Sequence, residues 1–181
     1  ELLQKAVSQS PQNAEAQTNL GNVLAHLGKE SAATLAYEKA MQVDPDYTEA
    51  FFNFGILMEG CGQPEKAIVA LNKALEKEPH HVLALHGLGN AFKTLSRLEE
   101  AKAAFQAALK IDPSLSMART NLAAVLHEIG DFKGATDESQ RAIKINPDLY
   151  EAQYNLGTAL QELGRHDEAI IAYEQVLIRQ P

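Results

Sequence analysis

Residues 14–47 read AEAQTNLGNVLAHLGKESAATLAYEKAMQVDPDY, and variants of this stretch fill the rest of the chain. The period is 34 residues, as six of the seven prolines show: Pro11, Pro45, Pro79, Pro113, Pro147 and Pro181. A fixed period without insertions is the signature of a repeat architecture. The chain therefore divides into the second helix of a truncated preceding repeat over residues 1–13, and repeats over 14–47, 48–81, 82–115, 116–149 and 150–181.

Each repeat is predicted to hold two antiparallel helices joined by a tight turn. Apolar residues recur at helical spacing on both sides of the turn, as at Leu20, Leu24, Ala33 and Tyr37. Glycine, which readily enters the left-handed conformation that ends many helices, marks the turn in four repeats, with a serine in the third: Gly28, Gly62, Ser96, Gly130 and Gly164.

The start of the following helix carries a second local signal. Asp46 with Glu49, and Asp148 with Glu151, have capping-box spacing just after a proline. No segment shows the alternation of a strand. Because one helix pair cannot bury both of its apolar faces, the pairs must stack into a continuous core. The predicted fold class is an all-α solenoid of antiparallel helix pairs.

This pattern resembles the tetratricopeptide repeat. The likeness rests on the 34-residue period and on the stretches AEAQTNLG at 14–21 and EAQYNLG at 151–157, and it also rests on the recurrence of residues equivalent to Ala33, Tyr37, Ala40 and Pro45. It covers essentially the whole chain. The resemblance implies a right-handed superhelix whose concave groove, lined by the first helix of each repeat, holds peptides or partner proteins.

Composition excludes several classes of function. The 181 residues include 24 acidic and 16 basic side chains, for a net charge of -8. Nucleic-acid backbones need clustered Lys and Arg, so this chain is a poor candidate for binding them. No apolar run reaches the ~18 residues that a membrane-spanning helix needs. The sequence does not name a compartment, and the cytoplasm is our expectation.

The motifs of catalysis and cofactor binding are absent from the sequence, so we predict neither an enzyme nor a cofactor. There is no phosphate-binding loop and no nucleophile elbow. Cys61 has no cysteine partner, and His80-His81 and His127-Glu128 lack the spacing of a metal site. Cys61 takes a position where other repeats have Leu or Ile, which predicts a core residue.

The fourth repeat departs from the pattern. Ser139 stands where the other repeats have a bulky side chain, and Arg119 takes a position held by Gln, Phe or Leu elsewhere. One interpretation is a weaker second helix with compensating neighbours. The alternatives are a hinge or a seat for a side chain of a partner.

Asparagines gather on the predicted groove wall. Six of the nine occupy two of the 34 repeat positions: Asn19, Asn53, Asn121 and Asn155 at one, Asn22 and Asn90 at the other. An amide can pair with both the N–H and the C=O of an extended peptide. Such a ladder is similar to that of the O-GlcNAc transferases, although Gly87 interrupts it here. The alternative is that these amides bond within or between repeats.

Other side chains on the same wall indicate what kind of peptide it would accept. Phe52 and Tyr154 offer apolar contact, and His86 can add charge below about pH 6.5. Carboxylates at Glu15, Glu49 and Glu151 favour neutral or basic peptides over acidic ones. The alternative is that these carboxylates only keep the surface soluble.

Three functions remain open. The first is a non-catalytic interaction module or scaffold that binds an extended peptide or a partner helix in the groove. The second is the substrate-recognition arm of a larger enzyme, such as a glycosyltransferase. The third is a scaffold that associates end to end through its terminal helices, because Ile170, Tyr173 and Leu177 are expected to be exposed in the last repeat.

Overall fold

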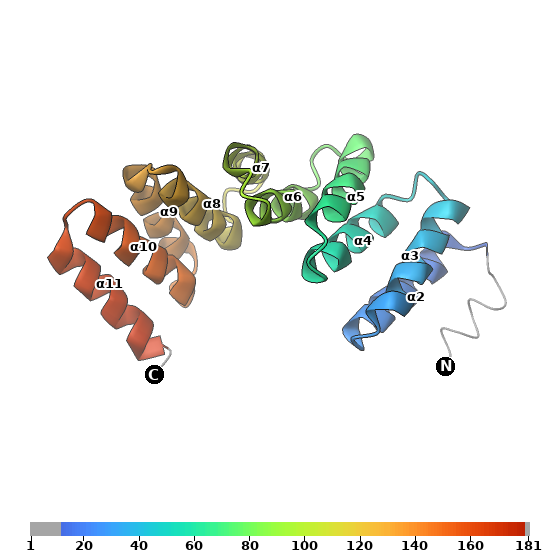
Figure 1. Ribbon diagram of the computed structural model, residues 1–181, viewed down its shortest axis with the longest axis horizontal. Coiled ribbons are helices and arrows are strands. Elements are labelled where there is room, and N and C mark those ends of the chain that lie inside the picture. Colours follow the sequence, from blue (N-terminus) through green and yellow to red (C-terminus); the bar gives the residue numbers. More distant parts are fainter. Residues whose placement is uncertain (1–11, 180–181) are drawn as a thin grey trace. The chain divides into compact units, whose positions relative to one another are not determined.

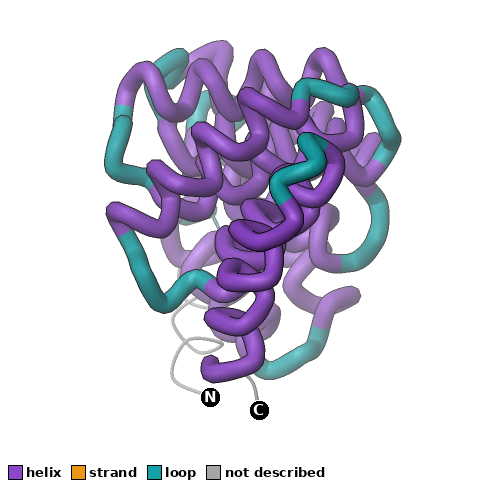
Figure 2. The backbone as a smooth tube through the Cα atoms, turned by 90° about the vertical axis from the view of Figure 1, so that its left-hand side faces the viewer, coloured by secondary structure: helices purple, strands orange, loops and turns teal. Residues whose placement is uncertain are grey.

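The computed structural model describes residues 12–179, and this part of the chain forms helices and no strands (Figures 1 and 2). The helices are α2 (Ala14–His26), α3 (Glu30–Val43), α4 (Thr48–Gly60), α5 (Pro64–Lys77), α6 (Val82–Thr94), α7 (Leu98–Ile111), α8 (Ser116–Ile129), α9 (Phe132–Ile145), α10 (Tyr150–Glu162) and α11 (His166–Arg179). The all-α prediction and the two-helix unit are confirmed. The helix predicted over residues 1–10 lies outside the described residues.

The chain falls into two compact units, residues 1–91 and residues 92–181. In the first unit, α2 packs against both α3 and α4, and α4 packs against α5. In the second, α8 packs against α7, α9 and α10, and α10 packs against α9 and α11. None of the helices that the structure describes is long and apolar enough to cross a membrane.

Close approach between paired helices depends on glycine in the first helix of the pair. A Cβ atom built on Gly21 would lie 2.5 Å from the buried Tyr37 ring, and one on Gly157 would lie 2.6 Å from Tyr173. A Cβ atom built on Gly55 would likewise lie 2.7 Å from the Leu71 side chain. Alanines with no exposed surface, such as Ala33 and Ala40, complete these contacts. The small residues therefore set the distance between helices, and the bulky ones fill the space left.

The turn between paired helices has the left-handed backbone that the glycines predict. Gly28, Gly62, Gly130 and Gly164 have φ values of 69°, 67°, 89° and 72°. Ser96 adopts the same conformation, with a φ of 56°. Among the described residues, it is the one residue other than glycine that has a positive φ. A side chain in this region is strained, because its Cβ crowds the following carbonyl.

Replacing Ser96 with glycine should therefore stabilise the protein by about 0.5–1 kcal/mol, since relief of strain exceeds the added freedom of the unfolded chain. Urea unfolding followed by circular dichroism would measure this. Ser31→Gly is the matched control: Ser31 is exposed in the first turn of α3, so glycine there should be neutral or destabilising. Equal effects of the two substitutions would contradict the explanation by strain.

The capping-box prediction for Asp46 and Asp148 is wrong. The N-cap residues of α4 and α10 are Tyr47 and Leu149, one position later, and neither side chain makes a capping hydrogen bond. Instead, at Pro45, Pro113 and Pro147 the side chain of the residue before the proline accepts a hydrogen bond from the backbone N–H of the residue after the proline. Asp46 donates to Asp44 Oδ1 at 3.0 Å, Ser114 to Asp112 Oδ1 at 2.9 Å, and Asp148 to Asn146 Oδ1 at 3.1 Å. The acidic or amide residue thus organises the turn rather than the helix.

In the fourth repeat, neighbouring residues compensate for the missing bulky side chain. Ser139 is fully buried, and Ala123 stands where Gly21 and Gly157 stand in their repeats, so a larger residue on α8 faces a smaller one on α9. The Ser139 hydroxyl has no hydrogen-bond partner among the described residues. Helix α9 has 14 residues, as α3 and α5 do.

An ion pair also joins α8 to α9 at this place. Arg119 donates to Glu138 Oε2 at 2.6 Å, and both side chains are largely buried, with 13% and 14% of their surface exposed. Arg119 also donates to the carbonyl oxygen of Pro113, and Arg141 donates to Glu138 Oε1 at 2.7 Å. The unusual Arg119 therefore has a partner within its own repeat.

Candidate functional site

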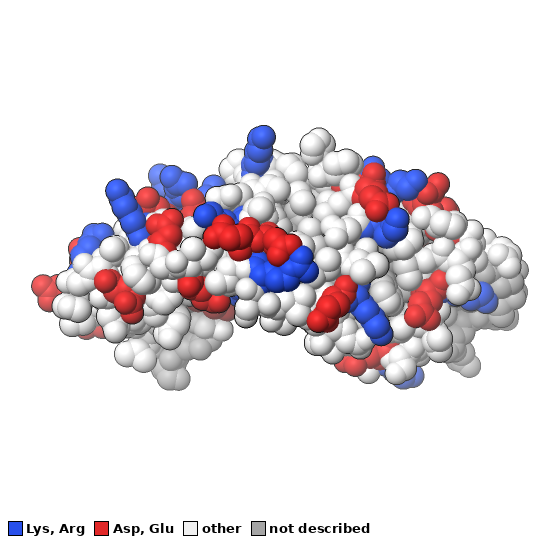
Figure 3. Space-filling model, turned by 45° about the horizontal axis from the view of Figure 1, so that its top comes forward, with Lys and Arg blue, Asp and Glu red and all other residues white. Residues whose placement is uncertain are grey.

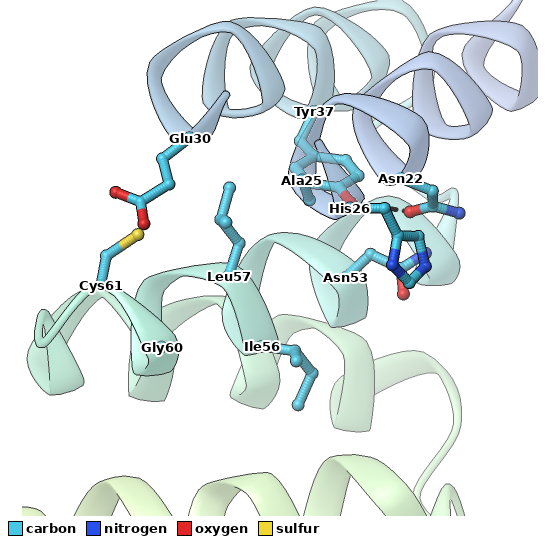
Figure 4. Close-up of a pocket in the computed structure, with 10 residues that line it drawn as sticks. All are labelled: Asn22, Ala25, His26, Glu30, Tyr37, Asn53, Ile56, Leu57, Gly60 and Cys61. Carbon is cyan, nitrogen blue, oxygen red and sulfur yellow. Dashed lines mark hydrogen bonds between the residues drawn. The ribbon is translucent and has the colours of Figure 1, made fainter. Parts of the chain in front are cut away.

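A cavity of about 500 Å³ lies between α2, the start of α3, and α4 in the first unit (Figure 4). It has three parts: a polar end with Asn22, His26 and Asn53; an apolar middle with Ala25 and Leu57; and a far end with Glu30, Gly60 and Cys61. Ile56 also lines the cavity, but its side chain points away from Leu57 (Figure 4). We call it the anchor pocket. It lies on the helix faces where the sequence predicted a groove wall.

The polar end is fixed from behind by a buried tyrosine. Tyr37 Oη donates to Asn22 Oδ1 at 2.7 Å, and burial raises the pKa of Tyr37 to about 12, so the hydroxyl remains a donor at neutral pH. Because the amide oxygen is held by this bond, the amide nitrogen of Asn22 points away from Tyr37 (Figure 4). Asn53, on the neighbouring helix, presents a second amide to the same end of the pocket.

The far end pairs a carboxylate with a thiol. The Glu30 side chain reaches toward the Cys61 sulfur (Figure 4). Burial raises the pKa of Cys61, and the hydrogen bond to Glu30 and the Glu30 charge raise it further. The thiol therefore stays neutral and donates to the carboxylate. Glu30 is also the first residue of α3, where the helix dipole favours a negative charge.

The prediction that Cys61 is a core residue is wrong. It is half-buried in the wall of an open pocket. The equivalent residues Leu27 and Leu163 are 64% and 41% exposed, whereas Ile129 packs against the core of the second unit, so burial at this repeat position varies from repeat to repeat. Its apolar composition gave a misleading signal.

Two small residues leave room for the pocket. Ala25 and Gly60 stand where other repeats have larger side chains: Glu59, Lys93, His127 and Gln161 at the position of Ala25, and His26, Thr94, Glu128 and Glu162 at that of Gly60. Gly60 is the last residue of α4 and has no positive φ. A Cβ atom built there meets nothing within 4 Å. Glycine is a poor helix former relative to alanine, so Gly60 weakens the end of α4 somewhat and leaves space.

The pocket brings together two of the six predicted asparagines, Asn22 and Asn53. The other predicted residues of the first unit lie outside its lining: Asn19, Glu15 and Glu49 are exposed, Phe52 and His86 are half-buried, and so is Asn90 on α6. Phe52 packs on His81 with ring centroids 4.5 Å apart, and Glu49 Oε2 accepts a hydrogen bond from Tyr47 at 2.6 Å.

In the second unit, one asparagine bonds between repeats, as the alternative interpretation allowed. Asn155 on α10 donates from Nδ2 to the carbonyl oxygen of Thr120 on α8, at 3.0 Å. Tyr154 is 53% exposed, with its ring centroid 6.0 Å from that of Tyr173. Asn121 is half-buried on α8, and Glu151 is exposed on α10.

Sequence reasoning missed Glu30, Tyr37, Gly60 and Cys61 as pocket residues. The small size of Gly60 relative to its equivalents was a usable signal, because a helical glycine without positive φ calls for an explanation. The Glu30–Cys61 contact gave no such signal, since it joins two different repeats. The described residues form no cluster of three or more His, Cys, Asp or Glu side chains placed to hold a metal ion.

Two further surfaces stand out. On α11, Ile170 and Leu177 are 55% and 67% exposed, as predicted, while Tyr173 is half-buried. A second cavity, of about 380 Å³, lies against α3, α4 and α5 and is lined by Phe51, Phe54 and Val69, among others. Elsewhere on the face shown in Figure 3, acidic and basic side chains are interspersed.

Comparison with protein families identifies the repeat. Family models of the tetratricopeptide repeat match residues 2–34 and 36–69, 60–125, 125–164 and 150–181, and together these cover nearly the whole chain. Comparison with curated proteins gives no match.

Several solved structures share the fold. MamA is 25% identical, with a TM-score of 0.83, over 88% of this chain and 94% of that one. YrrB, described as a tetratricopeptide repeat protein with an unusual peptide-binding site, is 20% identical with a TM-score of 0.83, over 100% of this chain and 93% of that one. A thermophilic tetratricopeptide repeat protein from Thermus thermophilus is 22% identical with a TM-score of 0.72, over 93% of this chain and 92% of that one.

Proposed function

Because the chain is built of tetratricopeptide repeats, we propose that it is a non-catalytic interaction module that holds an extended peptide against its first helices, with the anchor pocket as the main point of attachment. The observation that carries this proposal is the pair of amides at the polar end of the pocket. Asn22 and Asn53 stand on neighbouring helices beside a cavity of about 500 Å³, a volume in the range of ligand sites.

The orientation of Asn22 supports binding to a peptide backbone. Its oxygen is already engaged by Tyr37 at 2.7 Å, so its N–H groups remain to donate to a carbonyl acceptor of a bound peptide. The Asn53 amide offers both a donor and an acceptor. An extended strand presents alternating C=O and N–H groups, which match this pair and require no particular sequence in the peptide.

The pocket next to these amides would then receive one side chain of the peptide. Ala25, Ile56 and Leu57 supply apolar contact, and burial of that side chain adds affinity to the backbone hydrogen bonds. The exposed carboxylates of Glu15 and Glu49, in the same unit as the pocket, would disfavour acidic peptides. We therefore propose neutral or basic peptides as ligands.

Filling the pocket provides the test. Gly60→Leu should weaken peptide binding at least about tenfold, equivalent to 1.4 kcal/mol, because the new side chain occupies the cavity. The fold should be kept, since a Cβ atom at this position meets nothing within 4 Å. The ligands would come from affinity selection with a random decapeptide library, and fluorescence anisotropy would give the dissociation constants.

Glu128→Leu is the matched control. Glu128 is exposed and occupies the equivalent position in the fourth repeat, outside the anchor pocket. This variant should bind the selected peptides as the parent protein does, and both variants should keep the parent's helical circular dichroism. Equal affinity of Gly60→Leu and the parent would show that the pocket is not the point of attachment.

A further inference from the structure

We propose that the anchor pocket selects a lysine or arginine side chain of the bound peptide, whose cation pairs with Glu30. This inference rests on the function proposed above and specifies its ligand. It follows from three features of the pocket: an unneutralised carboxylate at the far end, an apolar passage leading to it, and a length that only a long side chain can span.

Among residues 12–179, the carboxylate of Glu30 has no cationic partner. The ion pairs formed by residues 12–179 involve other acidic groups, and the contact seen for Glu30 is the neutral Cys61 thiol. His26 lies at the opposite, polar end of the pocket. A hydrogen bond between a carboxylate and a cation is stronger than one between a carboxylate and a thiol, so a lysine or arginine would improve on the present contact.

The passage to Glu30 suits the stem of a basic side chain. Leu57 stands between the polar end and the far end, with Ala25 beside it (Figure 4). Lysine and arginine carry three or four methylene groups below a charged tip, and they bury this stem against apolar surface while the tip stays with polar groups. A glutamate would bring its charge toward Glu30, and an aliphatic side chain would leave the carboxylate with the Cys61 thiol but no cation.

The dimensions agree with this assignment. Asn53 and Cys61 are eight residues apart on the same helix and its cap, so the two ends of the pocket are separated by about 12 Å at 1.5 Å per residue. Part of this span is taken up by the Asn53 amide at one end and by the Glu30 side chain at the other. The remainder requires a long side chain, and lysine and arginine are the long side chains that end in a cation.

The test compares peptides that differ at one side chain. The probes are acetylated and amidated peptides GSGAXAGSG, in which X is lysine, arginine, norleucine or glutamate. Norleucine keeps the aliphatic stem of lysine and lacks the ammonium group. Binding would be followed by NMR, from the side-chain amide signals of Asn22 and Asn53. The lysine and arginine peptides should bind about threefold more tightly than the norleucine peptide, in line with an ion pair to the exposed carboxylate of Glu30.

The variant Glu30→Gln should remove this preference. The lysine peptide should then bind only as well as the norleucine peptide, whose own affinity should not change. Glu38→Gln is the control, because Glu38 is an exposed glutamate of α3 outside the pocket lining, and it should keep the preference. Added salt should narrow the gap between lysine and norleucine in the parent protein.

The outcomes separate this inference from the proposed function. If the lysine and norleucine peptides bind equally to the parent, or if Glu30→Gln keeps the preference for lysine, the basic anchor is wrong while peptide binding in the pocket stands. If none of the peptides shifts the Asn22 and Asn53 signals, and library selection yields no ligand that Gly60→Leu rejects, then both proposals fail together.

Discussion

Replacing Glu138 with alanine should lower the free energy of unfolding by about 2–3 kcal/mol. Glu138 and Arg119 are 14% and 13% exposed and 2.6 Å apart, so the substitution leaves a largely buried guanidinium without its carboxylate. Breaking a buried ion pair costs about 3–5 kcal/mol. The expected loss is smaller here, because Arg119 keeps its hydrogen bonds to the carbonyl oxygen of Pro113. Urea unfolding followed by circular dichroism measures the change.

The double variant Arg119→Gln, Glu138→Ala should recover most of the loss. Other repeats hold this combination naturally, with Gln17 opposite Ala36 and Gln153 opposite Ala172, and all four residues are buried. Glu168→Ala is the control for loss of an exposed ion pair, because Arg165 and Glu168 are about half exposed, and it should change stability little. A double variant as unstable as Glu138→Ala alone would contradict this account.

Gly21→Ala should destabilise the protein by about 2 kcal/mol. The added methyl group would lie 2.5 Å from Cε1 of Tyr37, a rigid and buried ring that cannot move without losing its hydrogen bond to Asn22. Overpacking of this kind costs about 1–3 kcal/mol, and the gain in helix propensity offsets only part of it. The substitution should also shift the NMR signals of the Asn22 side-chain amide, because the Tyr37 ring that bonds this amide would be displaced.

The same substitution at Gly60 is the matched control. Both glycines lie in the first helix of their repeat, but a methyl group added at Gly60 would have no neighbouring atom within 4 Å. Gly60→Ala should therefore stabilise the protein slightly, by up to about 0.5 kcal/mol, because Gly60 is the last residue of α4 and only part of the difference in helix propensity applies there. Opposite signs for Gly21→Ala and Gly60→Ala would confirm that packing against Tyr37 decides the effect. A loss of similar size at both sites would contradict it.

The sequence predicts the fold well because each local signal, such as a turn glycine, recurs at the same position in several repeats. Gly28, Gly62 and Gly130 mark the same turn, and the structure gives each a positive φ. In a single repeat, a glycine required by a turn could not be told from one that only leaves space. Comparison of five equivalent positions distinguishes the two. Gly60 is the instructive case, because its helical environment identifies it as a residue of the second kind.

The details of the candidate site could not be predicted in the same way. The bond from Tyr37 to Asn22 and the contact of Glu30 with Cys61 depend on side-chain orientation between helices, which a one-dimensional pattern does not contain. The capping-box prediction failed for a related reason. Asp46 had the right spacing from Glu49, but Tyr47 is the N-cap of α4, and the Asp46 carboxylate pairs with Lys77 on α5 instead. Spacing shows that an interaction is available, and competition among neighbours decides which one forms.

Cys61, the lone cysteine, lies in the wall of the anchor pocket, so its rate of alkylation can be used to test whether the pocket is occupied. Because there is a single Cys, an alkylating reagent reports on one place only. Its raised pKa keeps the thiolate scarce at neutral pH, so modification should be slow there and faster in alkaline solution. A peptide that fills the pocket would shield the sulfur, and the slowing of alkylation would then count bound molecules without any added label.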